Sequence, residues 1–185
     1  VSLMTIKNDL QQKLVLPYII PNIIGKTAKE NNVEVIISKS NPSSMMNTML
    51  NPKAGKESES FQYILSYHAV WSIGIIVDFL VGNDLKLIDL INELPDFYFA
   101  KNEISCEWKN KGSVMRKIIE EYKGKNIELF EGVKILDDKG WAIILPDSER
   151  PLFNIYAEGY SQEYAEELSL FFSEKVQRLL KDQSQ

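Results

Sequence analysis

The sequence has only one cysteine and one histidine, and this scarcity excludes several kinds of site. With Cys106 alone, the chain has no internal disulfide and no cysteine-based zinc site. With His68 alone, it has no multi-histidine metal site, and Cys106 has no nearby histidine to activate it as a nucleophile. We therefore expect a structural role for His68, packing of Cys106 in the core, and a reducing, cytoplasmic setting.

Surplus positive charge and glycine-rich phosphate loops are also missing. Lys and Arg total 21 against 26 for Asp and Glu, a net charge of −5, which argues against sequence-independent binding of nucleic acid. Neither G-x-G-x-x-G nor G-x-x-x-x-G-K-[ST] occurs, so dinucleotide-binding and P-loop functions are excluded. These two absences remove the commonest nucleotide-dependent functions.

Long hydrophobic runs are absent as well. The longest, 70–80, is interrupted by Ser72, Gly74 and Asp78 and is much shorter than the roughly 20 residues that span a bilayer. The first residues do not show a basic segment followed by an apolar one, so we expect no signal peptide. We therefore expect a chain without membrane segments.

What is present is typical of a globular protein. The chain has 185 residues, of which 44% are hydrophobic and 25% charged. This is enough apolar material for a real core in one domain or in two small ones.

The first half of the chain has a strand–helix–strand pattern. Leu14–Leu16 and Val33–Ile37 are predicted strands, and the helix between them starts at Pro21. Strands joined by such a crossover pair in parallel. A short methionine-rich helix is predicted from Asn41, followed by a mobile loop at 51–60.

Two more helices are predicted before the middle of the chain. Residues 67–80 are apolar on nearly every face, as expected of a helix packed between layers. Asp84 is then the predicted N-cap of a helix that Pro95 ends, with an apolar stripe on it. That stripe consists of Leu87, Ile88, Ile91 and Leu94.

The pattern changes to helix, short strands and helix from Ile104 onward. Ser113 is a predicted N-cap, and Ser161 is the predicted N-cap of a long amphipathic helix at the end. Three short strands lie between them, at 132–136, 141–145 and 152–157, and Asp137–Gly140 is a hairpin signal. We therefore predict an α/β three-layer βαβ domain at 1–103, followed by a small α+β domain at 104–185, an antiparallel sheet with two helices. The boundary lies near Lys101 to Glu103.

One segment between two predicted strands carries candidate chemistry, Leu145–Pro151. A turn with a serine, an arginine and free backbone N–H groups can hold a phosphate. The alternative is a tight turn stabilised by Asp147 bonding to the backbone, and Asp147 and Glu149 would repel phosphate unless they point away. The acidic pairs 120–121 and 137–138 are expected to be solvated charges, with metal binding the alternative.

The order of several short motifs resembles the C-terminal part of the α-D-phosphohexomutases. The resemblance covers about residues 12 to 180, and the closest similarity is to the phosphomannomutase-like half of proteins fused to a mannose-1-phosphate guanylyltransferase. The residues that carry it are N-D-L-K-L-I-D-L-I-N-E-L-P at 83–95, 97–108, Lys111–Arg116, Glu131–Lys134, Gly140-Trp141, Pro146-Asp147 and Pro151–Glu158. The first domain would then be the family's third domain and the second its fourth.

The resemblance implies a cleft of four domains, with a phosphoserine in the first and an Mg²⁺ loop of the D-G-D-x-D-R type in the second. Neither motif occurs here, so we expect no catalytic residue, no metal ligand and no cofactor in this chain, with Mg²⁺ held by the intact parent. The family's phosphate loop, R-P-S-G-T-E-P, aligns with Leu145–Pro151. Leucine replaces its arginine, and acidic residues stand where hydroxyls are expected. The phosphate-binding candidates are therefore Ser148, Arg150 and, nearby, Asn154.

The family's sugar-recognition loop should fall near Glu57–Tyr67, but glycine is absent there. Two functions follow from these matches and departures. The first is a C-terminal fragment of a sugar-phosphate mutase that recognises the sugar phosphate, weakly when isolated from the missing N-terminal domains of the same protein. The parent would interconvert hexose 6-phosphate and 1-phosphate, and a guanylyltransferase fused to it would couple this reaction to GDP-mannose synthesis. The second is a non-catalytic regulatory or assembly module that retains the mutase fold. Exposed faces that would have met the missing domains favour a homodimer.

Overall fold

The chain folds into two units, Val1–Asp96 and Phe97–Gln185. The structure is a computed structural model that describes residues 1–7, 13–50 and 58–182. The division precedes the predicted one at 103/104 because that position lies inside strand β3 (Tyr98–Ser105). This strand pairs along its whole length with β7 (Leu152–Gly159), so all of it is part of the second unit.

The first unit contains the predicted parallel strand pair. Strands β1 (Lys13–Pro17) and β2 (Glu34–Ser38) pair in parallel, with Leu14 opposite Val35. Helix α2 (Asn22–Glu30) connects them and buries Ile24 and Ala28. The βαβ prediction is therefore confirmed, because the crossover helix covers the apolar side chains of both strands. A short helix, α1 (Ser2–Ile6), precedes β1.

Two helices pack beside this strand pair. Helix α3 (Pro42–Met49) begins where predicted, and the side chain of its N-cap Asn41 accepts a hydrogen bond from Ser44 N at 2.8 Å. Helix α4 (Ser58–Tyr67) occupies part of the predicted mobile loop and the region expected to hold the sugar-recognition loop. Gln62 of α4 holds the helix against the sheet, because it exchanges two hydrogen bonds with the backbone of Val15. Residues 51–57 of the predicted loop lie outside the described residues.

Helix α5 (Ala69–Gly82) differs from its prediction as a helix buried between layers. Val70 is 84% exposed and Trp71 is 71% exposed. Ser72 is buried and bonds back to carbonyls of α4 and to that of His68, whereas the opposite side of α5 is uncovered. Although its sequence is apolar on nearly every side, α5 packs through one face only. Hydrophobicity alone therefore predicted more burial than the helix has.

Helix α6 (Leu87–Asn92) also differs from its prediction. The predicted N-cap Asp84 lies ahead of the helix with φ 50°, and Lys86 is the N-cap residue. Leu90 is buried, whereas three residues of the predicted stripe, Leu87, Ile88 and Ile91, are each more than half exposed.

Helix α4 and the apolar helix α5 follow one another in the chain, and both are short. Within the described ranges, no single helix is both long and apolar enough to span a bilayer. Residues 61–67 and 69–82 meet the criteria only as a pair, and they are bent by 118°.

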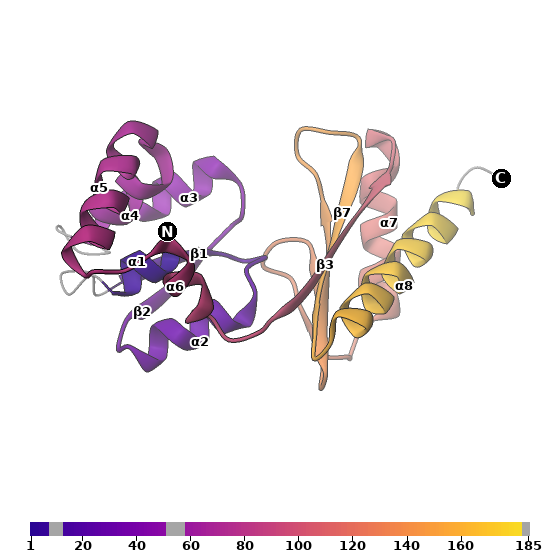
Figure 1. The fold of residues 1–185 in the computed structure, drawn as a ribbon. Helices are drawn as coiled ribbons and strands as arrows, with labels where there is room; N and C mark the ends of the chain where they lie inside the picture. Colours follow the sequence, from indigo (N-terminus) through magenta and orange to yellow (C-terminus); the bar gives the residue numbers. More distant parts are fainter. Residues whose placement is uncertain (8–12, 51–57, 183–185) are drawn as a thin grey trace. The chain divides into compact units, whose positions relative to one another are not determined.

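The second unit is an antiparallel sheet covered on one face by two helices (Figure 1). Its strand order is β3-β7-β6-β5-β4, where β4 is Ile127–Glu128, β5 is Val133–Asp137 and β6 is Gly140–Pro146. The helices are α7 (Trp108–Glu121) and α8 (Gln162–Lys181). The α/β unit followed by an α+β unit with two helices confirms the predicted fold class.

Local signals in the second unit mostly have their expected effect. The turn between Asp137 and Gly140 joins β5 to β6, and Ser161 caps α8 by accepting a hydrogen bond from Tyr164 N at 3.2 Å. The predicted cap Ser113 is wrong: α7 begins earlier, at Trp108, and the Ser113 hydroxyl donates to the Asn110 carbonyl inside the helix. Buried residues of the sheet and both helices form one core, including Val114, Ile118, Ile144, Phe153, Ile155 and Val176.

Candidate functional site

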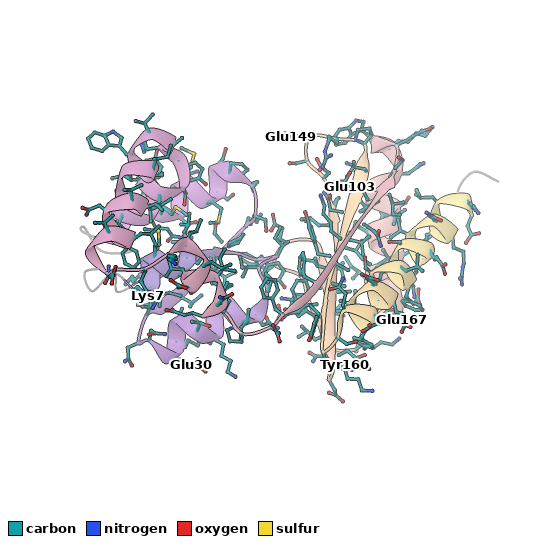
Figure 2. The ribbon with its side chains drawn as sticks, in the orientation of Figure 1. Lys7, Glu30, Glu103, Glu149, Tyr160 and Glu167 are labelled. Atoms are coloured by element: carbon teal, nitrogen blue, oxygen red, sulfur yellow. The ribbon has the colours of Figure 1, made fainter. Side chains whose placement is uncertain are left out.

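The loop between β6 and β7 is held at both ends by backbone hydrogen bonds. Asp147 N donates to the carbonyl of Leu152 at 3.1 Å, and Cys106 N donates to the carbonyl of Pro151 at 2.8 Å. These bonds involve no side chains, so they do not depend on the side chains that the loop presents. The loop lies at one end of the second unit, where Glu149 and Glu103 are labelled in Figure 2.

The carboxylate of Asp147 is the centre of the loop. Its Oδ1 accepts the backbone N–H groups of Glu149 at 2.9 Å and Arg150 at 2.8 Å. Its Oδ2 accepts from the guanidinium of Arg150, at 3.2 Å from Nε and 3.0 Å from Nη2, and from the amide Nδ2 of Asn154 at 3.0 Å. Backbone N–H groups, a guanidinium and an amide are the donors that also bind a phosphate. The expected turn bond of Asp147 is present, as one part of a larger anion-binding arrangement.

These contacts determine the ionisation of Asp147. The backbone N–H of Glu149 lowers the pKa of the carboxyl most, and the N–H of Arg150 and the side chains of Asn154 and Arg150 lower it further. The pKa therefore lies far below the ordinary value of an aspartate, although burial opposes the shift. Asp147 is therefore an anion in the folded chain at neutral pH.

Lys111 supports the loop from helix α7. Its Nζ donates to the carbonyl oxygens of Asp147 at 2.6 Å and Arg150 at 2.5 Å, and it lies 3.7 Å from the centre of the Trp108 ring. The residue is buried, and burial lowers the pKa of its ammonium group. The interpretation of the sequence missed this role. A signal was present, because Lys111 shares the buried side of α7 with Val114 and Ile118 at spacings of three and seven residues.

The three predicted site residues have different surroundings. Arg150 and Asn154 both donate to Asp147, and Arg150 also reaches Glu103 at 3.4 Å. Ser148 is exposed in the loop and is not among the donors to Asp147. The structure thus brings Arg150 and Asn154 together around one carboxylate.

Asn154 lies on the sheet face that the helices do not cover. Its neighbours in the strand, Phe153 and Ile155, point into the helix-covered core, so Asn154 points the opposite way. Glu103 is its partner across the sheet, and the Lys101 hydrogen bond lowers the pKa of Glu103. Asn154 is 5% exposed, and its Oδ1 accepts no hydrogen bond from the described part of the chain. A buried carbonyl oxygen without a donor is costly, and a ligand hydroxyl would satisfy it.

The other chemical candidates do not form a site. Cys106 is buried as predicted, and burial raises the pKa of its thiol. His68 is exposed just before α5, edge-on to the Tyr63 ring. Asp137 accepts a hydrogen bond from the Tyr164 hydroxyl. Among the residues that the structure describes, no three His, Cys, Asp or Glu side chains are grouped so that they could hold a metal ion.

Comparison with known proteins identifies relatives of this chain. No family model matches it. A phosphoglucomutase/phosphomannomutase of Thermococcus kodakarensis is 27% identical over 154 residues, covering 79% of this chain and 34% of the relative. A phosphoglucosamine mutase of Methanococcus maripaludis is 33% identical over 86 residues, covering 45% of this chain and 19% of the relative. The chain therefore spans about a third or less of the length of these curated relatives.

A solved structure has the same fold. A phosphoglucomutase/phosphomannomutase family protein of Burkholderia thailandensis superimposes with a TM-score of 0.69, covering 98% of this chain and 40% of that one, at 12% identity. Its identity is too low to carry more than the fold. The homologues of this chain are sugar-phosphate mutases. They are, more particularly, members of the phosphoglucomutase/phosphomannomutase and phosphoglucosamine mutase groups.

Proposed function

We propose that this chain is the C-terminal part of a phosphohexomutase and recognises the phosphate of a hexose phosphate through the loop between β6 and β7. The observation that carries this proposal is the convergence of two backbone N–H groups, the Arg150 guanidinium and the Asn154 amide on one anionic group. Its relatives include mutases whose names specify phosphorylated sugars, which gives the anion its chemical class.

Each predicted site residue has a distinct role in this proposal. Arg150 supplies a permanent positive charge and a two-nitrogen donor to the phosphate. Ser148, exposed beside it, supplies a hydroxyl. The buried amide of Asn154 donates through Nδ2, and its Oδ1 accepts a hydroxyl of the sugar. Lys111 positions the loop and does not contact the ligand.

The chemical step requires groups from outside this chain. Phosphoryl transfer needs a positioned nucleophile and a metal ion that neutralises the transferred charge. The phosphoserine and D-G-D-x-D-R motifs are absent from the sequence. We propose that the intact parent supplies them together with Mg²⁺, and that this chain alone binds substrate without converting it. A parent that also carries a guanylyltransferase, and a cytoplasmic location, are parts of the same proposal, and the coding sequence upstream of Met4 would test the domain content.

A binding experiment tests the role of the loop. We expect the chain to bind mannose 1-phosphate weakly, with a dissociation constant on the order of 1 mM, because much of the cleft of the parent is missing. Titration followed by NMR should show this binding weakened about tenfold or more in Arg150→Ala. Arg178→Ala is the matched control, since it removes the same charge from α8, outside the loop. Equal binding by Arg150→Ala and Arg178→Ala, or sub-micromolar affinity of the unmodified chain, would contradict the proposal.

A second function is favoured by one specific observation, the occupation of the donors by Asp147 itself. A loop whose donors are already taken suits a non-catalytic regulatory or assembly module that has kept the mutase fold. Assays of the full-length parent separate the two functions. Mutase turnover that falls in the Arg150→Ala parent supports the first, and a parent that assembles normally without turnover supports the second.

A further inference from the structure

The two carboxylate oxygens of Asp147 accept hydrogen bonds from several donors in and beside the loop. Five nitrogen atoms are involved: the backbone nitrogens of Glu149 and Arg150, Nε and Nη2 of Arg150, and Nδ2 of Asn154. A carboxylate offers about four lone-pair directions, so this group is saturated. A phosphate oxygen that entered the loop would need the same donors.

The surrounding charges add to this competition. The Asp147 side chain is 14% exposed, so a phosphate beside it would meet a poorly screened negative charge. Glu103 also reaches Arg150, and it is paired with Lys101 at 2.7 Å. Lys111 does not neutralise this negative charge, because its ammonium group is hydrogen-bonded to the two loop carbonyls. A bound dianion and an unmoved Asp147 are therefore electrostatically incompatible.

The loop does not depend on Asp147 alone for its shape. Lys111 holds the carbonyls of Asp147 and Arg150, and backbone bonds to Leu152 and Cys106 fix the ends of the loop. None of these contacts uses the side chain at position 147, so we expect them to remain when that side chain is changed. The donors would then remain near one another with their acceptor removed.

We propose that Asp147 is the specificity-determining residue of this loop: its carboxylate acts as an internal substitute for the ligand's phosphate, which binds only when the carboxylate is displaced. This role of Asp147 rests on the proposed function only for the identity of the ligand as a sugar phosphate. Binding of inorganic phosphate tests the role of the carboxylate directly. The Asp147 carboxylate is then the cause of a low affinity for phosphate. Removing its negative charge makes the surrounding N–H groups available to a phosphate.

The experiment measures binding of inorganic phosphate by ³¹P NMR to the full chain and four variants. Asp147→Ser and Asp147→Asn should each bind phosphate at least tenfold more tightly than the unmodified chain. Asp147→Asn keeps an oxygen that can accept the backbone N–H groups, so it tests the charge with the loop retained. Asp138→Ser is the control, because it removes one exposed carboxylate from the turn between β5 and β6. Adding Arg150→Ala to Asp147→Ser should abolish the gain.

The outcomes separate this inference from the proposed function. If both folded Asp147 variants bind phosphate no better than Asp138→Ser, the inference is overturned, even if Arg150 still governs binding of mannose 1-phosphate. If they gain affinity for inorganic phosphate but bind mannose 1-phosphate no better than phosphate itself, the inference holds and the sugar-phosphate function fails. Circular dichroism and thermal melting establish folding, and Asp147→Asn decides the result if Asp147→Ser does not fold.

Discussion

Lys111 of helix α7 places its ammonium nitrogen 2.6 Å from the backbone carbonyl oxygen of Asp147. The same residue thus has a buried cation bonded to its carbonyl and five donors bonded to its carboxylate. Because the backbone and side chain of Asp147 are held by different groups, their contributions can be measured separately.

Replacing Lys111 with methionine should lower the stability of the second unit and loosen the loop. Lys111→Met keeps the hydrophobic stem beside Trp108 and removes two hydrogen bonds from a charged donor. We expect a loss of about 1.5–3 kcal/mol in the free energy of unfolding, since the part-buried carbonyl of Asp147 loses the ammonium group and that of Arg150 keeps only the N–H of Leu152. Urea unfolding measures this loss. Lys109→Met is the control, because Lys109 is exposed on the same helix and should change stability by less than about 0.5 kcal/mol. Similar losses in both variants would show that Lys111 does not anchor the loop.

The Asp147 carboxylate should make stability dependent on pH in the acid range. Its folded pKa lies below the unfolded value of about 3.9, so the unfolded chain takes up the proton first as pH falls. The stabilisation is therefore complete above about pH 5 and is lost progressively as the pH falls toward the folded pKa. Glu103, whose pKa is also lowered, contributes a smaller part in the same range.

Urea midpoints between about pH 3 and 7 test this dependence. The unmodified chain should lose stability more steeply than Asp147→Asn as the pH falls below about 5, so that the two curves approach each other. Asp138→Asn, at an exposed turn, should follow the unmodified chain. Parallel curves for Asp147→Asn and the unmodified chain would mean that these hydrogen bonds do not stabilise the folded state.

Two glycines of the second unit should respond in opposite directions to alanine. Gly132 has φ 72°, and a Cβ there would lie 2.4 Å from the carbonyl oxygen of Ile144, so Gly132→Ala should destabilise by more than about 1 kcal/mol. Gly112 lies within α7 with open space where a Cβ would be placed, so Gly112→Ala should stabilise by about 0.5–1 kcal/mol. Thermal melting of both variants measures the difference. A neutral Gly132→Ala would show that β5 and β6 shift apart easily at this point.

Regular periodicity and local caps were enough to predict much of the fold. The predicted strand at 152–157, the hairpin signal before Gly140 and the cap at Ser161 each depend on nearby residues, and the structure contains all three. Predictions that depended on long-range packing were less successful. The exposed side of α5 around Trp71 could not be predicted, because hydrophobicity does not say which face finds a partner.

The candidate site was only partly visible in the sequence. Arg150 and Asp147 stand in one turn, and the bond from Asp147 to the backbone follows from their spacing. The contributions of Lys111 and Glu103 come from elements far away in the sequence, and their contact with the loop depends on the tertiary fold. The saturation of the Asp147 carboxylate was missed although Asn154 is only seven residues away, because the spacing does not show that the Asn154 amide turns toward Asp147.

The attachment of the loop through backbone groups also has an evolutionary consequence. Backbone hydrogen bonds of Asp147 N and of the Pro151 carbonyl hold the two ends of the loop, and they do not involve side chains. The hydrophobic core of the second unit is built from other residues. Point mutations between these attachments can therefore change the side chains that the loop presents while the two backbone bonds at its ends remain. Such a segment is free to diversify after gene duplication without rebuilding the core of the second unit.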